Sequence, residues 1–191
     1  MTADAAAPQV RSGMKISVDE TLVTSYSCTL GAVVSQSKAL IAGHCGKVGQ
    51  PVYDKSGTTI GKITANQITR KLDIAVITLA PRAVVRQDVI AWDSSFWKGQ
   101  KLSKSGITTG FGTGAVVEPA PTLRTSRGFT LAPPFLNEHA TYSVKTTLRS
   151  ESGDTGAGVR DANGRIVGIL SSGADDYTNI APVSRLPQAL R

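Results

Sequence analysis

The sequence predicts an all-β protein of the barrel or sandwich type. Long helical periodicity is missing from the 191 residues, and apolar residues recur instead in short runs separated by turn residues. Glycine, which suits turns between short strands, occurs 19 times. Many short strands at regular spacing are typical of a barrel or a sandwich.

In the first half of the chain, the expected strands are short runs rich in apolar and β-branched residues. They cover 14–18, 28–34, 39–42, 50–53, 58–63 and 73–79. Residues 54–57, Asp-Lys-Ser-Gly, form a turn between two of these runs. The last run is almost continuously apolar, which is typical of a buried strand.

Residues 80–99 interrupt this pattern with proline and charged side chains, and we interpret them as a crossover between two lobes. The strands expected after the crossover cover 100–103, 108–118, 122–130, 141–148, 158–160 and 165–171. The Asn-Gly pair at 163–164 is a hairpin signal because it tolerates positive φ. The tail after Pro182 is expected to form one or two helical turns. These observations place one lobe at 1–90 and the other at 91–191.

Composition argues against several classes of function. With 40% hydrophobic and 18% charged residues the chain is globular. The net charge is +7, but the positive residues are scattered and only ten aromatic side chains (four Phe, four Tyr and two Trp) are present. We therefore expect no nucleic-acid partner. No apolar run approaches the roughly 20 residues that span a membrane, and residues 1–8 lack the hydrophobic segment of a secretion signal.

The two cysteines, Cys28 and Cys45, suit one disulfide. Such a bond would contribute about 3 kcal/mol in the chain-entropy model and would imply an oxidising compartment; two free buried thiols are the alternative. No Cys-x-x-Cys motif exists, and His44 and His139 lie far apart in the sequence, so the four ligands of a zinc site are not expected. We expect neither a metal nor another cofactor.

Three segments carry residues with catalytic chemistry. His44 follows an apolar strand, Asp73 opens the apolar run 73–79, and Thr155 lies in the glycine-rich stretch 152–158. Each has a simpler explanation, as a surface histidine, a strand-end cap or an ordinary turn.

Together, the three segments supply the parts of an acyl-transfer site. Histidine can take the proton of a hydroxyl near neutral pH, and a carboxylate can hold the imidazole in the correct tautomer. Glycine beside the hydroxyl residue permits the tight turn that aims backbone N–H groups at a developing oxyanion.

As a set, these motifs resemble the chymotrypsin-type serine proteases, most of all the secreted bacterial group that includes streptogrisins and α-lytic protease. The matching segments are 42–45 for the histidine motif, 73–76 for the aspartate motif, 153–156 (Gly-Asp-Thr-Gly) for Gly-Asp-Ser-Gly, 104–110 for a streptogrisin stretch and 168–173 for the strand that pairs with substrate. The resemblance runs from about Cys28 to Pro182. It implies two six-stranded antiparallel β-barrels with a short C-terminal helix.

The resemblance also implies the roles of residues in the cleft between the barrels. His44 and Asp73 would come from the first barrel and Thr155 from the second. The N–H groups of Gly153 and Thr155 would form the oxyanion hole. The remaining implied elements are a peptide-binding strand end at Ser171, Ser172 and Gly173, a pocket near 149–152, 171–173 and 177–179, and a Cys28–Cys45 disulfide.

Three residues depart from the family pattern: Thr155, Lys104 and, to a smaller extent, Ala157, where a second glycine often lies. Thr155 keeps the hydroxyl of the expected serine but adds a methyl group, which restricts χ1. A misfit of about 1–3 kcal/mol would slow the reaction roughly 5- to 150-fold. Lys104 stands where an arginine tends to pair with the aspartate before the nucleophile, so we predict a Lys104–Asp154 pair, with a solvated Lys104 as the alternative.

The leading hypothesis is a slow endopeptidase that acts on proteins or peptides as a secreted or cell-envelope monomer. The rival hypothesis is a pseudoprotease that binds peptides without turnover, because Thr155 suggests a relaxed demand for catalysis. A third reading is an engineered variant of an active serine enzyme, although alanine is the commoner choice for inactivation. His139, in the polar segment 133–140, is expected to be exposed.

Overall fold

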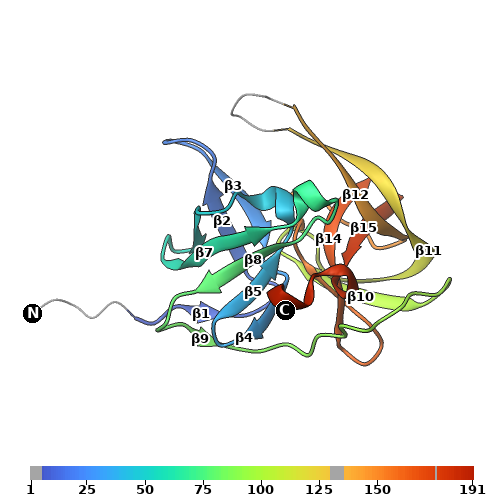
Figure 1. The fold of residues 1–191 in the computed structure, drawn as a ribbon, viewed down its shortest axis with the longest axis horizontal. Coiled ribbons are helices and arrows are strands. Elements are labelled where there is room, and N and C mark those ends of the chain that lie inside the picture. The colour runs from blue at the N-terminus through green and yellow to red at the C-terminus, as the bar shows by residue number, and fades with distance from the viewer. Residues whose placement is uncertain (1–5, 130–135, 175) are drawn as a thin grey trace, which may run out of the picture.

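The computed structural model describes residues 6–129, 136–174 and 176–191 (Figure 1). The chain is mostly β-strand and forms two curled antiparallel sheets, as the sequence predicts. The sheet built from the first half of the chain lies beside the sheet built from the second half, and the crossover runs along one side of both (Figure 1). No helix among these residues is long and apolar enough to cross a membrane.

The first sheet has seven strands in the order β3-β2-β6-β7-β8-β5-β4. Their bounds are β2 (Lys15–Asp19), β3 (Ser25–Thr29), β4 (Ala32–Ser35), β5 (Lys38–Ile41), β6 (Pro51–Asp54), β7 (Thr59–Asn66) and β8 (Ala75–Leu79). Strands β3 and β4, at the two edges of the sheet, were expected as one strand. The sheet therefore curls so that its two edges continue into each other.

The chain bends at Gly31 to make this change of partner. The Leu30 N–H donates to the Met14 carbonyl at 2.9 Å, whereas the Gly31 N–H donates to the Leu40 carbonyl at 2.9 Å. A Cβ atom on Gly31 would lie only 2.6 Å from Ile169 Cδ1. Glycine is therefore needed here because the second lobe packs directly against the bend.

The second sheet is a closed barrel in the order β10-β11-β12-β15-β14-β13. Its strands are β10 (Lys101–Gly106), β11 (Gly110–Phe129), β12 (Leu136–Thr146), β13 (Gly158–Arg160), β14 (Ile166–Ala174) and β15 (Tyr177–Pro182). Strand β11 is one strand where two were predicted. Irregularities in its register between Val116 and Thr122 surround Pro119 and Pro121, because proline interrupts a ladder without ending extended backbone.

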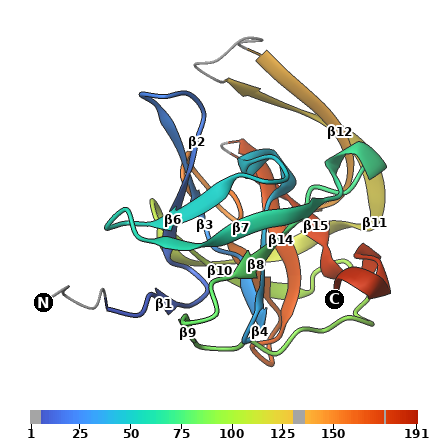
Figure 2. The ribbon, with the colours of Figure 1, turned by 60° about the vertical axis from the view of Figure 1, so that its left-hand side comes forward.

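The long β11–β12 hairpin projects beyond the barrel on the same side as the β2–β3 hairpin (Figure 2). Strand β15 was missed by the sequence analysis. Its buried residues run continuously from Thr178 to Pro182, a pattern without the alternation that marks a half-buried strand.

The crossover is anchored to both lobes. Strand β1 (Gln9–Val10) pairs in parallel with β9 (Val84–Val85). Downstream, the Asp88 carboxylate accepts the Val33 N–H at 2.8 Å and lies 2.6 Å from Arg160 Nη2. The C-terminal tail forms two short 3₁₀ turns, η3 (Val183–Arg185) and η4 (Gln188–Leu190), where a short helix was predicted.

The lobes share apolar packing. The buried cluster of the first lobe includes Leu40 and Ile77 together with Ile166 and Ile169 from the second lobe. A separate cluster, with Val144 at its centre, fills the second barrel. This shared packing fixes how residues at the facing ends of the strands meet.

The predicted disulfide is present. Cys28 in β3 and Cys45 in the 3₁₀ turn η1 (Gly43–Cys45) are bonded, with their Cα atoms 6.3 Å apart. The bond ties the turn that carries His44 to the first sheet.

Candidate active site

A histidine–aspartate pair forms where β5 ends and β8 begins. In these antiparallel strands Ile41 pairs with Ala75, so the residues that follow β5 and the residues that precede β8 are neighbours. His44 Nδ1 lies 2.7 Å from Asp73 Oδ2, and the His44 backbone N–H donates to Asp73 Oδ1 at 2.9 Å. The carboxylate thus holds both the ring and the backbone of the histidine.

The second lobe contributes to this pair through Ser171 in β14. The Ser171 hydroxyl donates to Asp73 Oδ2 at 2.5 Å, and both side chains are buried. The sequence resemblance implied only a peptide-binding role for Ser171. Nothing in the sequence around Ser171 or Asp73 indicates that the two residues meet. The contact follows from the way the two sheets pack against each other.

Asn66, at the end of β7, braces the histidine turn. Its Nδ2 donates to the Gly43 carbonyl at 2.7 Å and to the Gly46 carbonyl at 2.8 Å, while its Oδ1 accepts the Ile68 N–H at 2.9 Å. Sequence analysis missed this residue because an isolated asparagine at the end of a strand reads as a turn residue.

The electrostatics of the pair favour a charged aspartate and a basic imidazole. Burial lowers the pKa of His44, but the charge of Asp73 and its hydrogen bond outweigh burial and raise this pKa above its ordinary value. Burial raises the pKa of Asp73, but the charge of His44 and hydrogen bonds from His44 and Ser171 outweigh it and lower the pKa. A charged Asp73 can only accept, so Nδ1 carries the hydrogen and Nε2 is free to act as a base.

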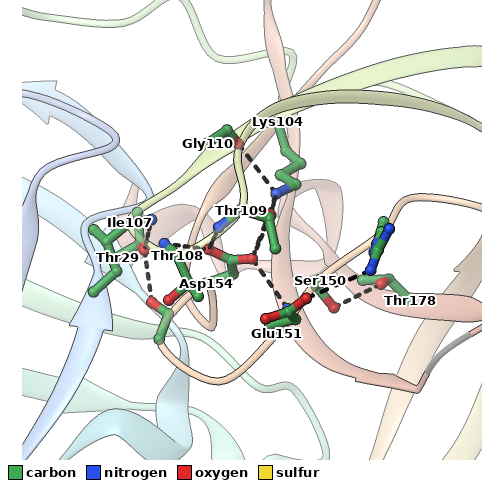
Figure 3. A network of polar contacts seen from close by, with 12 residues as sticks. Thr29, Lys104, Ile107, Thr108, Thr109, Gly110, Ser150, Glu151, Asp154 and Thr178 are labelled. Carbon is green, nitrogen blue, oxygen red and sulfur yellow. Dashed lines mark hydrogen bonds and ion pairs between the residues drawn. The ribbon is translucent and has the colours of Figure 1, made fainter.

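The loop that carries Thr155 joins β12 to β13 and is braced around Asp154 (Figure 3). The fully buried Asp154 carboxylate accepts the N–H groups of Thr108 at 2.9 Å, Thr109 at 3.1 Å and Glu151 at 3.0 Å. The Thr109 hydroxyl adds a bond of 2.6 Å. Burial raises the pKa of Asp154, but these hydrogen bonds outweigh burial and lower it.

Lys104 is the buried counter-charge of this network. Its Nζ lies 3.5 Å from Asp154 Oδ2 and donates to the Gly110 carbonyl at 3.1 Å and to the Thr109 hydroxyl. The Lys104 side chain is only 1% exposed. The structure thus brings together the two residues for which the sequence predicted an ion pair.

The backbone of the loop presents two unused donors. The Gly153 carbonyl accepts the Thr29 hydroxyl at 2.8 Å, and the Thr155 carbonyl accepts the Thr29 N–H at 2.8 Å. Within the described parts of the chain, the N–H groups of Gly153 and Thr155 donate no hydrogen bond. Gly153 has φ 99° and Gly156 has φ 91°, values that favour glycine. This arrangement can accept an oxyanion.

The Thr155 side chain lies near the phenol of Tyr26. Among the described residues, no hydrogen bond joins the Thr155 hydroxyl to the His44 imidazole. Burial and the charges of Asp73 and Glu20 raise the pKa of Tyr26, and the nearby Thr155 side chain partly offsets this rise. The Tyr26 ring meets the His44 ring edge-on, with centroids 6.5 Å apart.

Sequence analysis missed Tyr26, although one signal could have found it. Tyr26 lies two residues before Cys28 on β3, so both side chains point to the same face. The disulfide carries that face toward the His44 turn.

The prediction for His139 was wrong. His139 lies in β12, not in a polar loop, and its ring is half-buried and stacked near the His44 ring with centroids 6.4 Å apart. Residues 133–135 of the predicted loop lie outside the described residues. Burial and the charge of His44 lower the pKa of His139. The long β11–β12 hairpin brings His139 to the site, which no local pattern signals.

The end of β14, which includes Ser171, lies beside the histidine–aspartate pair. Residues Ser172 and Gly173 pair with Asn179 and Thr178 of β15. On the opposite edge, β13 pairs only with residues up to Ile169, so among the described strands none covers residues 171–174 there. An extended peptide could pair with this edge of β14.

Neither a protein-family model nor a curated protein matches the chain. Solved structures do match it over nearly its whole length. Cellulomonas bogoriensis chymotrypsin is 22% identical, with a TM-score of 0.65 and 95% of each chain covered. Thermobifida fusca protease A is 19% identical, with a TM-score of 0.68 and coverage of 93% of this chain and 94% of the other.

The Nocardiopsis protease NAPase is similar to the same degree. It is 19% identical, with a TM-score of 0.69 and coverage of 95% of this chain and 96% of the other. At these identities the likeness concerns the fold. The chain therefore has the chymotrypsin-like fold of the bacterial serine proteases.

Proposed function

We propose that this protein is a slow endopeptidase that hydrolyses peptide bonds with a His44–Asp73–Thr155 triad. The observation that carries the proposal is the 2.7 Å contact between His44 and Asp73 beside a hydroxyl residue whose loop offers two unused N–H donors. The fold shared with bacterial serine proteases supports it.

In this mechanism, His44 Nε2 takes the proton of the Thr155 hydroxyl as its oxygen attacks the substrate carbonyl. The N–H groups of Gly153 and Thr155 stabilise the oxyanion. The imidazolium returns the proton to the departing amine, and water then hydrolyses the acyl-threonine by the same base. The β-methyl group of Thr155 restricts χ1, and the nearby Tyr26 phenol competes with His44 for the hydroxyl. For these two reasons we expect the reaction to be slow.

The substrate is a peptide that pairs with residues 171–173 as an added strand. No cofactor takes part. We place the protein outside the cytoplasm, secreted or in the cell envelope, because the Cys28–Cys45 disulfide requires an oxidising compartment. We expect it to act as a monomer.

A second candidate function is a peptide-binding pseudoprotease. The specific observation in its favour is the Thr155 hydroxyl, which makes no hydrogen bond to His44 among the described residues. A protein of this kind would keep the groove and the fold without turnover.

Labelling with a fluorophosphonate separates the two candidates. The peptidase proposal predicts covalent labelling of Thr155 that disappears in His44→Ala and Thr155→Ala, measured by mass spectrometry of the intact protein. Labelling only after Thr155→Ser would favour the pseudoprotease. If neither the parent nor Thr155→Ser reacts, the peptidase proposal is wrong.

A further inference from the structure

The region next to Thr155 where a substrate side chain would enter is occupied by the protein itself. We propose that the site accepts only a small side chain (glycine, alanine or serine) at the substrate residue whose carbonyl is attacked. This inference rests on the proposed function. It assigns the restriction to Ser150, Gly173 and Thr178.

The two walls of this pocket are in contact. One wall is the loop 149–152, which leads to Thr155, and the other is the end of β14, where Gly173 pairs with Thr178. The Ser150 and Thr178 hydroxyls are 2.8 Å apart (Figure 3). A Cβ atom on Gly173 would clash with Ser150 Oγ and lie 3.0 Å from Thr178 Oγ1. The space that glycine leaves open is therefore filled by Ser150.

Neither wall is free to retreat. Thr178 is fully buried, and its carbonyl accepts the Thr146 hydroxyl at 2.9 Å. Ser150 precedes Glu151, whose N–H donates to the buried Asp154 carboxylate at 3.0 Å. A large substrate side chain would have to displace Ser150 from this tethered loop, and such overpacking is unfavourable.

Among the described residues that form the two walls, none brings a charged group into the pocket that would select a charged side chain. Arg149 and Glu151, on either side of Ser150, are exposed and lie 3.7 Å from each other. Lys145 Nζ lies over the Tyr177 ring, 4.6 Å from its centroid. A buried cation or carboxylate on the substrate would find only hydroxyls, which do not repay its desolvation.

The test uses fluorogenic peptides that differ only at the residue before the scissile bond, which is Ala, Leu, Phe, Arg or Glu. We expect kcat/KM for the Ala peptide to exceed that for the Leu and Phe peptides about tenfold or more. Ser150→Gly removes the side chain that fills the pocket, so it should raise kcat/KM for the Leu peptide about tenfold. Ser56→Gly, in the exposed turn between β6 and β7, is the matched control and should leave the ratio unchanged.

A binding measurement tests the pocket without relying on turnover. N-acetylated tetrapeptides ending in Ala or Phe are titrated into the His44→Ala variant, and the dissociation constants are measured by NMR. We expect the Ala peptide to bind more tightly and Ser150→Gly to abolish the difference. If nothing is cleaved but this preference holds, the proposed function fails and the inference stands. If Phe or Arg peptides are cleaved or bound as well as Ala peptides, or if no peptide binds, the inference is wrong.

Discussion

The two halves of the candidate site differ in what they hold in place. In the first lobe, Asp73 contacts both the ring and the backbone of His44, so the base and its acid are already aligned. In the second lobe, the backbone around Thr155 is equally well held by the network of Asp154 and Lys104, but among the described residues the Thr155 hydroxyl makes no hydrogen bond to His44.

This difference teaches that alignment of a backbone does not ensure alignment of the side chain it carries. Hydrogen bonds to Asp154 hold the backbone of the loop in place. The position of the Thr155 hydroxyl relative to that backbone depends on the side-chain angle χ1 alone. The β-methyl group limits the available χ1 values, and the Tyr26 phenol lies near the hydroxyl. In the proposed mechanism, the first lobe therefore supplies an aligned base and the second lobe limits the rate.

The largest effect on turnover is expected when the Asp73 carboxylate of the first lobe is removed. Asp73→Asn should lower turnover by about 10⁴-fold, as loss of the triad carboxylate does, because His44 then takes the wrong tautomer. The measurement is kcat in the Thr155→Ser background, where activity is highest. Asp93→Asn, at an exposed position in the crossover, is the control.

The same variant should also change the pH profile. Asp73 raises the pKa of His44, and only neutral His44 can take a proton, so activity should fall as the pH drops through a midpoint above 6.5. Without the carboxylate, burial alone acts on the imidazole and the midpoint should move below 6.5. An unchanged midpoint would contradict His44 as the base.

The next effect concerns the braced backbone of the second lobe. Lys104→Met should lower the free energy of unfolding by about 3–5 kcal/mol, because it leaves the buried Asp154 charge without its cation. Lys101→Met, on the same strand but exposed, should change stability by about 0.5 kcal/mol or less. Urea denaturation measures both. Equal effects of the two variants would show that the buried pair does not stabilise the loop.

The smallest effect tests the hydroxyl itself. Tyr26→Phe removes the phenol oxygen that lies near Thr155. An interaction of about 0.5–1.5 kcal/mol between this oxygen and the Thr155 hydroxyl corresponds to a roughly 2- to 12-fold increase in the rate of fluorophosphonate labelling when it is lost. In the Thr155→Ser background the increase should vanish, because serine can rotate toward His44 without the methyl group.

The control for this prediction is Tyr53→Phe, at a half-buried tyrosine in β6. It should leave the labelling rate unchanged in both backgrounds. A decrease on Tyr26→Phe would mean that the phenol positions the hydroxyl for attack, and our account of the slow reaction would be wrong.

Much of the fold could be predicted from local pattern. The predicted apolar run 73–79 contains β8. The Asn-Gly turn at 163–164 joins β13 to β14, as expected. The chain bends between β3 and β4 at Gly31, which packs against Gly156 and Ile169, two residues that are distant in the sequence. No window of neighbouring residues contains that contact, so the predicted strand 28–34 could not be divided.

The candidate site was predictable to the same extent. Within each of the three motifs, around His44, Asp73 and Thr155, the residues lie within a few positions of one another, and the order of the motifs along the chain is sufficient to suggest a common chemistry. The neighbours of these residues come from other strands. His139 and Tyr26 reach the His44 ring from β12 and β3, and Ser171 reaches Asp73 from the other lobe.

By itself, the sequence determined the all-β class, the disulfide partners and the identity of the groups that could do chemistry, because these depend on residue type and short-range order. Only the tertiary structure decided which side chains surround the Thr155 hydroxyl and whether a pocket lies open beside Gly173. Both depend on side chains that meet across lobes and strands, where a rotation about one bond changes the partner of a hydroxyl without changing any local pattern.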